Sequence, residues 1–244
     1  MYSTDEMGTT SSTEQYRELL DEYSSKPQGY YEQSRREMIE YVPPSSRSIL
    51  EIGCGTGGFG AALKEAIPGC EVWGIEPDAA AAAIAAKRLD VVINSLFSAD
   101  ARELSGQQFD AICFNDVLEH MIVPERALES CKALLSPNGV VVASIPNILF
   151  FYQIAEILIQ QDWRYVDSGI LDKTHLRFFT KKSIVRMFES CGYEISRIEG
   201  INSFRSTGSR FGWKYRVVNM LTLGRLSDWK YIHFAVQARS KRAS

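Results

Sequence analysis

The amino-acid sequence predicts an α/β protein in which a mostly parallel sheet is covered by helices on both faces. Between residues 48 and 146, short apolar runs alternate with stretches of helical periodicity, the order expected of βαβ units. A glycine-rich turn, "GCGTGG" at residues 53–58, joins the first apolar run to the first helical stretch. With 244 residues and 45% hydrophobic composition, the chain suffices for one sizeable core but not for two domains with linkers.

The elements of the alternating region can be assigned in order. Short apolar runs predict strands, and apolar residues at helical spacing predict helices. The expected strands cover residues 48–53, 71–77, 91–97, 109–116 and 139–146. The expected helices cover residues 59–67, 79–88 and 124–135. Asp78 directly precedes three alanines, so it is the expected N-cap of the second helix.

Outside this region the chain is less regular. Before the first strand we expect disorder over residues 1–12 and a helical lid over residues 13–44, with a break at residues 26–29. After Pro146 we expect, in order, a helix at 147–161, a polar loop at 163–180, a helix at 181–190, a strand at 193–201, a basic and aromatic segment at 203–229, and a closing strand at 231–239. Residues 45–244 are thus predicted to form one domain with insertions at about 148–180 and 203–230.

The cysteines and the apolar runs bear on where the protein works. The five cysteines are scattered without a C-x-x-C pair, which is typical of free thiols in a reducing compartment. Residues 1–15 are polar and contain no apolar leader, and no apolar run is long enough to span a bilayer. The sequence therefore predicts a soluble cytoplasmic protein and leaves open a peripheral position at the inner face of the membrane.

The charges are unevenly distributed along the chain. Residues 1–200 carry 18 Lys and Arg against 29 Asp and Glu, whereas residues 201–244 carry 9 against 1. In segment 203–230 the basic residues alternate with aromatic ones, which fits an anionic membrane surface or a lipid-linked glycan. Packing against the protein's own body or an oligomer interface is the first explanation, and a membrane surface or an anionic glycan comes second. Nucleic acid is not expected as the main partner, because the sequence pI is about 5.7.

Glu51 bears on which ligand the glycine-rich turn binds. Gly53, Gly55 and Gly58 match the G-x-G-x-x-G pattern of dinucleotide-binding turns. A pyrophosphate needs N–H donors and the positive end of a helix, so a carboxylate two residues before Gly53 would repel it. A ligand with a cationic or zwitterionic head fits instead. A structural role for Glu51, as acceptor for the N–H groups of the turn, stays open.

Glu76 marks a second contact. It ends the second expected strand, 25 positions after Glu51, where an acid can accept both hydroxyls of a ribose. NAD and S-adenosylmethionine share that ribose, so Glu76 alone does not choose between them.

Four stretches in succession resemble the motifs of class I S-adenosylmethionine-dependent methyltransferases: "LEIGCGTGGFG", "GIEPD", "FDAICFNDVLEHM" and "LLSPNGVVVASIPN". The resemblance covers about residues 48–147. It implies a Rossmann-like sheet of seven mostly parallel strands, with one antiparallel strand near the C-terminus. It also implies methyl transfer, with S-adenosyl-L-methionine as cofactor and S-adenosyl-L-homocysteine as product.

The resemblance also implies which residues hold the cofactor. The methionine part would contact the turn, the ribose the end of the second strand, the adenine the end of the third and the sulfonium the end of the fourth. In that order the residues are Glu51, Gly53, Cys54, Gly55 and Gly57; Glu76 and Pro77; Ser95, Leu96 and Phe97; and Asn115, Asp116, Val117 and His120. Ser95 stands where many relatives carry an Asp. Tyr31 and Arg35, in the N-terminal lid, would cover the cofactor.

An oxygen acceptor would lose a proton as the methyl group arrives, so it benefits from a general base. His120 follows the fourth strand, close to the expected sulfonium, and His175 lies in the later polar loop beside Asp172 and Arg177. We take His175 as the candidate base, with Asp172 or Arg177 orienting the substrate and His120 as second choice. Alternatively, Asp172 and Arg177 pair with each other. His233, in an alternating strand, is expected to be structural.

The acceptor class follows from a less specific likeness. The run "DKTHLRFFT" at residues 172–180 resembles a subset of these methyltransferases linked to bacterial surface polysaccharides and sugar methylation. It implies O-methylation of a sugar hydroxyl on a glycan or on a nucleotide- or lipid-linked saccharide. Another small metabolite, such as a quinone precursor or an amine, is the alternative, as is a cofactor-binding protein without catalysis. No metal is expected, because Asp116, Glu119 and His120 do not repeat a known ligand spacing.

Overall fold

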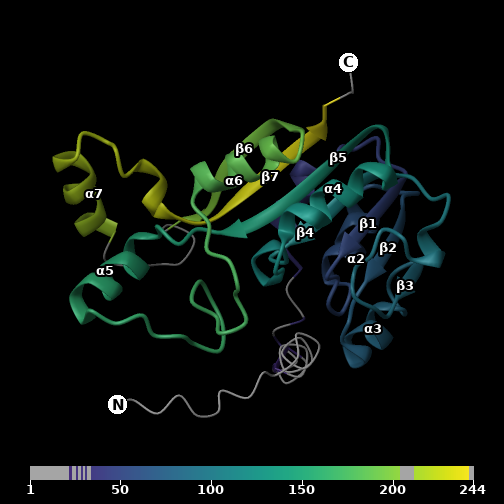
Figure 1. Ribbon diagram of the computed structural model, residues 1–244, viewed down its shortest axis with the longest axis horizontal. Coiled ribbons are helices and arrows are strands. Elements are labelled where there is room, and N and C mark those ends of the chain that lie inside the picture. Colours follow the sequence, from purple (N-terminus) through teal and green to yellow (C-terminus); the bar gives the residue numbers. More distant parts are fainter. Residues whose placement is uncertain are drawn as a thin grey trace, which may run out of the picture.

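A single seven-stranded sheet runs through the protein (Figure 1). The computed structural model describes residues 22, 23, 26, 29, 31, 34–203 and 212–241. The strand order is β3-β2-β1-β4-β5-β7-β6. The strands are β1 (Ser48–Ile52), β2 (Glu71–Ile75), β3 (Val91–Ile93), β4 (Phe109–Asn115), β5 (Leu135–Pro146), β6 (Tyr193–Ser203) and β7 (Tyr231–Ser240).

Strands β1 to β5 pair in parallel, and only β7 runs antiparallel to its neighbours β5 and β6 within this sheet. The fold class predicted from the sequence, including the antiparallel strand near the C-terminus, is confirmed. The central strands are apolar on both sides, as a doubly covered parallel sheet requires.

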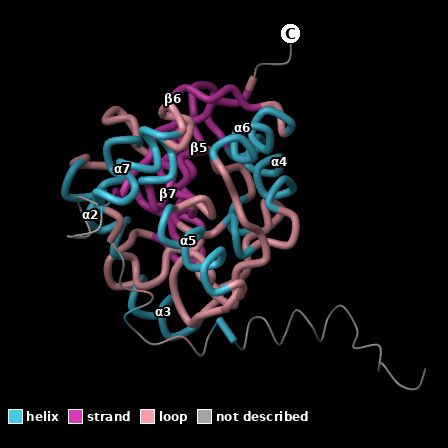
Figure 2. The backbone as a smooth tube through the Cα atoms, turned by 90° about the vertical axis from the view of Figure 1, so that its left-hand side faces the viewer, coloured by secondary structure: helices cyan, strands magenta, loops and turns pink. Residues whose placement is uncertain are grey.

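Helices cover both faces of the sheet, and Figure 2 shows α2 on one side of the strands and α4 and α6 on the other. One core cluster packs α4 and α6 against the sheet, and the second packs α2, α3 and the 3₁₀ helix η2 against its other face. The helices are η2 (Arg36–Tyr41), α2 (Gly58–Ala66), α3 (Ala79–Ala85), η3 (Arg102–Leu104), η4 (Leu118–His120), α4 (Pro124–Leu134), α5 (Phe151–Gln160), α6 (Lys181–Ser190), α7 (Gly212–Leu221) and η5 (Ser227–Lys230).

Two helix starts follow the expected capping chemistry. The Asp78 side chain accepts a hydrogen bond from the Ala81 N–H, which confirms it as the N-cap of α3. Thr180 and Ser183 form a capping box at the start of α6, so the loop before it ends at Thr180.

Several predicted boundaries were wrong. The strand expected at 91–97 ends at Ile93, because the Asn94 side chain donates to the Glu76 and Pro77 carbonyls and turns the chain. The helix expected from residue 147 begins only at Phe151. Asn147 is buried, and its amide donates to the carbonyls of Asp228 and Tyr231, which ties it to η5 and the start of β7.

The ends of the chain differ from the sequence-based expectation in other ways. The basic and aromatic segment at 203–229, for which no element was predicted, contains α7 and η5. Residues 36–41, expected to be α-helical, form the 3₁₀ helix η2. The disorder predicted for residues 1–12 and most of the predicted lid lie outside the described residues. Within the described ranges, none of the helices has the length and apolarity needed to cross a membrane.

Candidate active site

A cavity of about 980 Å³ opens at the carboxyl ends of the parallel strands. Open α/β sheets bind ligands at this edge. Its wall combines the turn after β1, the segment after β3, the end of β4 with η4, the loop before α6, and parts of the N-terminal segment and β7. The predicted site residues on this wall are Tyr31, Arg35, Glu51, Gly53, Cys54, Gly55, Pro77, Leu96, Phe97, Asn115, Asp116, Val117, His120, Asp172 and His175.

The glycine-rich turn is shaped by backbone geometry that other residues resist. Gly53, Gly55 and Gly57 have φ angles of 69°, 52° and 77°, all in the left-handed region. A Cβ on Gly55 would come within 2.7 Å of the Tyr31 carbonyl oxygen. The turn therefore closes tightly under the N-terminal segment. Gly57 begins α2 as its N-cap and is not among the described residues of the cavity wall.

Below this turn, the cavity wall contains buried polar atoms without protein partners. Glu51 is 3% exposed, and its Oε2 has no hydrogen-bond partner among the described residues. The same holds for the side-chain amide atoms of Asn115. Burial raises the pKa of Glu51 to about 8. Buried polar atoms are normally hydrogen-bonded, so these atoms could be satisfied by a ligand that donates and accepts hydrogen bonds, and a positively charged donor would favour the ionised form of Glu51.

Glu76 lies beside the cavity rather than on its described wall. It is fully buried, and its carboxylate accepts hydrogen bonds from the N–H groups of Gly55 at 2.8 Å and Asp78 at 2.9 Å. Burial raises its pKa to about 7. The acid thus supports the glycine turn in this structure, and a ribose would reach it only after a local rearrangement.

The segment after β3 differs in detail from the sequence-based assignment. Leu96 and Phe97 line the cavity, but Ser95 is not among the described residues that do, and its hydroxyl donates to the Leu96 carbonyl. Asp100 does line it. The sequence analysis missed Asp100, although it is an acid a few residues beyond the serine that occupies the expected aspartate position.

Arg35 and Asp116 meet across the cavity wall. Both have positive φ angles, 37° and 55°, which are strained for residues other than glycine, and their side chains form an ion pair. The Ser144 hydroxyl donates to the second Asp116 oxygen at 2.9 Å. His233 Nε2 lies 3.7 Å from that same oxygen, so the histidine expected to be structural is also part of the cavity wall. Burial and Arg35 lower the pKa of His233 to about 3.

The N-terminal segment is joined to the loop before α6 by a buried ion pair. Lys26 Nζ lies 2.6 Å from Asp172 Oδ1, and Lys26 also donates to the Asp167 carbonyl. Asp172 accepts further hydrogen bonds from Thr174. Asp172 therefore holds the segment that carries Tyr31 against the cavity.

Arg177 does not join Asp172. Its guanidinium donates to the Ile122 carbonyl from the outer side of the loop, and it lines a separate shallow depression near α4 and α6. The alternative that Asp172 and Arg177 pair is therefore wrong, since Asp172 pairs with Lys26.

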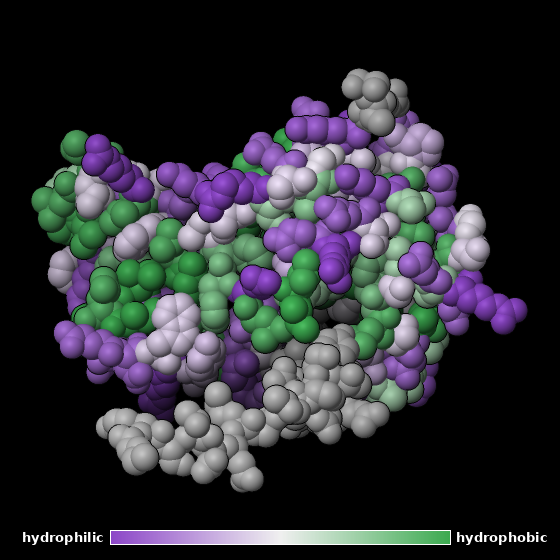
Figure 3. Space-filling model, viewed as in Figure 1, coloured by the Kyte–Doolittle hydropathy of each residue, from purple (hydrophilic) through white to green (hydrophobic). Residues whose placement is uncertain are grey.

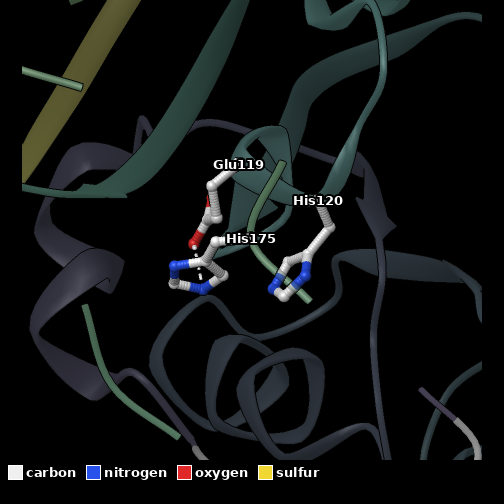
Figure 4. Close-up of side chains that lie close together, drawn as sticks. All are labelled: Glu119, His120 and His175. Carbon is white, nitrogen blue, oxygen red and sulfur yellow. Dashed lines mark ion pairs between the residues drawn. The ribbon is translucent and has the colours of Figure 1, made fainter. Parts of the chain in front are cut away.

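Two histidines and one glutamate converge on the other side of the cavity (Figure 4). Their potential ligand atoms all lie within 4.8 Å of one another, and His175 Nε2 is 4.0 Å from Glu119 Oε1. Glu119 is 1% exposed, and neither of its carboxylate oxygens has a hydrogen-bond partner in the described part of the chain. His120 and His175 come from η4 and from the loop before α6, and the sequence analysis did not assign Glu119 a role in the reaction.

Backbone carbonyls set the tautomers of both histidines. His175 Nδ1 lies 3.0 Å from the Ile170 carbonyl oxygen, and His120 Nδ1 lies 3.1 Å from that of Thr174. A carbonyl only accepts, so each Nδ1 carries the proton, and each neutral ring has its lone pair on Nε2. For His175 this lone pair is on the nitrogen beside Glu119.

Burial keeps this cluster electrically neutral near pH 7. It lowers the pKa of His175, and burial together with His175 lowers the pKa of His120 to about 4. Burial also raises the pKa of Glu119 to about 8. His175 is therefore a neutral imidazole that can accept a proton at Nε2.

Glu119, His120 and His175 are also close enough together to bind a metal ion, and no other such group of His, Cys, Asp or Glu occurs among the described residues. Ligand atoms around a tetrahedral zinc lie about 3.4 Å apart, because zinc–nitrogen bonds are about 2.0–2.1 Å long. The 4.0 Å between Glu119 and His175 is wider than that, so metal binding would require the side chains to move inward.

Comparisons with known proteins match the chain to methyltransferases. A family model described as "Methyltransferase domain" matches residues 23–198. The ubiquinone biosynthesis O-methyltransferase of Histophilus somni is 33% identical over 115 residues, which are 43% of this chain and 48% of that protein. Its counterpart in Dinoroseobacter shibae is 28% identical over 166 residues, 65% of this chain and 64% of that protein. The chain thus spans less than two thirds of the length of both relatives.

Solved structures show the same fold. A SAM-dependent methyltransferase from Archaeoglobus fulgidus superposes with a TM-score of 0.61 at 20% identity, covering 91% of this chain and 99% of that one. The plantazolicin methyltransferase BpumL, in complex with SAH, superposes with a TM-score of 0.54 at 17% identity, covering 94% and 92%.

Proposed function

Since the chain belongs to the methyltransferase domain family, we propose that it methylates a hydroxyl group, with His175 as the general base. In this proposal the methyl donor is S-adenosylmethionine, which the family match and the shared fold support. The observation that carries the proposal is the neutral His175 ring, whose Nε2 lone pair lies 4.0 Å from the buried Glu119 carboxyl. Such a base is needed for a hydroxyl acceptor but not for a neutral amine.

The cavity residues fit the cofactor at three points. Glu51 and Asn115 have buried, unpartnered polar atoms suited to the charged methionine end. Leu96 and Phe97 would flank the adenine. Asp100 lines the same part of the cavity and would accept a hydrogen bond from the adenine amino group. Gly53, Cys54 and Gly55 would approach the methionine part through their backbone. In this proposal Tyr31 and Arg35 close the cavity from the N-terminal side.

The chain's own part in the reaction is to position the acceptor and take its proton. When bound, S-adenosylmethionine supplies a methyl group on a positively charged sulfur. His175 Nε2 would accept the hydroxyl proton while the methyl group passes from the sulfur to the acceptor oxygen. The sulfur–methyl bond would break to leave S-adenosylhomocysteine, and the ring would become an imidazolium. The buried Glu119 carboxyl, which is neutral near pH 7, lies 4.0 Å from this ring, and the buried position excludes water.

A sugar hydroxyl is our first candidate for the acceptor. The likeness of residues 172–180 to sugar-modifying methyltransferases supports it, and that run carries both Asp172 and His175.

A phenolic hydroxyl of a quinone precursor is the second candidate. The names of the two curated relatives favour it. Both acceptors need a base, so the proposed role of His175 does not depend on the choice.

Methyl transfer to a panel of acceptors tests the proposal. The enzyme would be incubated with methyl-labelled S-adenosylmethionine and with nucleotide sugars, a catechol or a primary amine. We expect label in a hydroxyl acceptor, with sugars first. Label only in the amine would overturn the O-methylation proposal. Binding of S-adenosylhomocysteine without any transfer would instead indicate a non-catalytic protein.

A further inference from the structure

The end of the molecule formed by α5 and α7 carries an apolar surface that the fold leaves uncovered. No residue of α5 is buried, although half of the helix consists of Phe, Ile and Leu. The two helices contact each other, since the ring centroids of Phe151 and Tyr215 are 5.8 Å apart. We call the exposed apolar side chains at this end the α5–α7 patch, and they are Leu158, Ile159, Trp213, Met220, Leu221 and Leu223.

Most of the surface of each of these side chains is exposed to solvent. Their exposed fractions run from 59% for Trp213 to 87% for Leu223. Figure 3 shows apolar residues gathered at the end of the molecule where α5 and α7 lie, opposite the end with β1 to β3 and α3. Contiguous apolar surface of this kind marks a site of association with a protein or a membrane.

The charges around the patch indicate which of these it contacts. From α7 to the start of β7, the chain carries Lys214, Arg216, Arg225 and Lys230 against the single acid Asp228. Arg216 and Arg225 are exposed, so they are available to a partner. In and just after α5 the chain carries the acids Glu156 and Asp162. The positive charge near the patch is therefore concentrated along α7.

We propose that the α5–α7 patch binds the surface of an anionic membrane. Apolar side chains would enter the boundary between headgroups and acyl chains, while the basic residues of α7 contact the anionic headgroups. A two-fold dimer through the same patch would bring two copies of the same positively charged surface together, which is unfavourable. The patch lies outside the cavity, so this proposal does not depend on the identity of the acceptor.

Vesicle flotation with the full chain tests the proposal. The probes are vesicles of phosphatidylglycerol mixed with phosphatidylcholine, and vesicles of phosphatidylcholine alone. We expect binding to the first that weakens at high salt, and weak binding to the second. Replacing Lys214 and Arg216 by Ser should lower binding by roughly 30-fold, because both charges act near the surface. The matched control replaces the exposed Lys87 and Arg102 by Ser at the opposite end of the molecule, and it should bind vesicles as well as the wild type does.

A second pair of variants tests the apolar contacts. Met220→Glu with Leu221→Glu should reduce binding by roughly tenfold or more. Ala83→Glu with Ala86→Glu adds the same charge at the exposed face of α3 and should change it far less. Stabilisation by S-adenosylhomocysteine, measured on each variant, confirms that it folds.

Two results would overturn the proposal. One is no binding of the wild type to anionic vesicles even at low salt. The other is a concentration-dependent dimer that Met220→Glu with Leu221→Glu dissociates, which would make the patch an interface between copies. Neither result would bear on methyl transfer, which is measured separately.

Discussion

Glu51, Asn115 and Glu119 present buried polar atoms to the cavity that no described residue satisfies. Each such atom costs about 1–3 kcal/mol relative to a hydrogen-bonded one. A fold retains such groups where a ligand completes them, and the three lie at two different parts of the wall. Glu51 lies in β1 and Asn115 is the last residue of β4, whereas Glu119 lies in η4. These two groups of atoms are the proposed places for the charged end of the cofactor and for the acceptor.

Replacing Glu51 by Gln should weaken binding of S-adenosylhomocysteine by roughly 10- to 100-fold, the loss of one charge-assisted hydrogen bond. The pH dependence of the dissociation constant gives a sharper readout. The pKa of Glu51 is about 8 before binding, so a cationic ligand must displace a proton at lower pH. The dissociation constant should therefore fall by roughly tenfold per unit from about pH 6 to about pH 8. Calorimetry of Glu51→Gln should show no such slope, and a slope unchanged by the substitution would rule out this contact.

Glu119→Gln should lower activity and raise stability, and the gain in stability should depend on pH. The folded pKa of about 8 lies above the ordinary value of 4.5, so the folded state holds a proton that the unfolded state releases. That contribution to stability is complete below about pH 4.5 and is lost as the pH rises toward 8. Glu119→Gln does not lose stability in this way. Its free energy of unfolding should therefore exceed that of the wild type by up to a few kcal/mol between pH 5 and pH 8. Thermal unfolding measures it, and the exposed Glu129→Gln is the control.

Removal of metal ions should leave methyl transfer unchanged. The separation of Glu119 and His175 suits a proton-accepting pair better than a closed metal site. The enzyme would be dialysed against a chelator and assayed with and without added zinc or manganese. Activity lost on dialysis and restored by one of these ions would contradict the prediction.

Among the elements, the turn between β1 and α2 has the strongest sequence signal, because its three left-handed glycines are visible as a pattern. The alternating strands and helices were predictable for the same reason, since their periodicity is local. The boundaries that were wrong depend on distant partners. Asn147 delays α5 through bonds to η5 and the start of β7, and no local pattern encodes that contact.

Gly55→Ala should disturb both the turn and the segment that covers it. The added Cβ meets the Tyr31 carbonyl oxygen at 2.7 Å, in addition to the strain of a φ of 52°. Gly106→Ala is a matched control, because Gly106 has a φ of 76° and open space around it. We expect the control to lose about 1 kcal/mol of stability and Gly55→Ala to lose more, together with affinity for S-adenosylhomocysteine. Equal losses in thermal unfolding would show that the close approach to Tyr31 does not matter.

Across the whole molecule, the acceptor side of the cavity assembles from segments that are far apart in the chain. His175 could be singled out from the sequence by its charged neighbours, but its partner Glu119 lies 56 positions earlier. Asp172 was expected to orient a substrate, and it instead pairs with Lys26. Such pairings arise only when the sheet brings the ends of different strands to one edge. The identities of the residues were therefore predictable, whereas their partners were not.

The most direct test of His175 as the general base compares His175→Ala with His120→Ala in methyl transfer to a hydroxyl acceptor. Thermal unfolding with saturating S-adenosylhomocysteine would first confirm that both variants fold and bind the product; a ligand at 100 times its dissociation constant adds about 2.7 kcal/mol. We predict a loss of roughly 10²- to 10⁴-fold in kcat for His175→Ala and a smaller loss for His120→Ala. A His175→Ala enzyme that keeps the wild-type rate would show that no base is needed there, and would contradict O-methylation by this site.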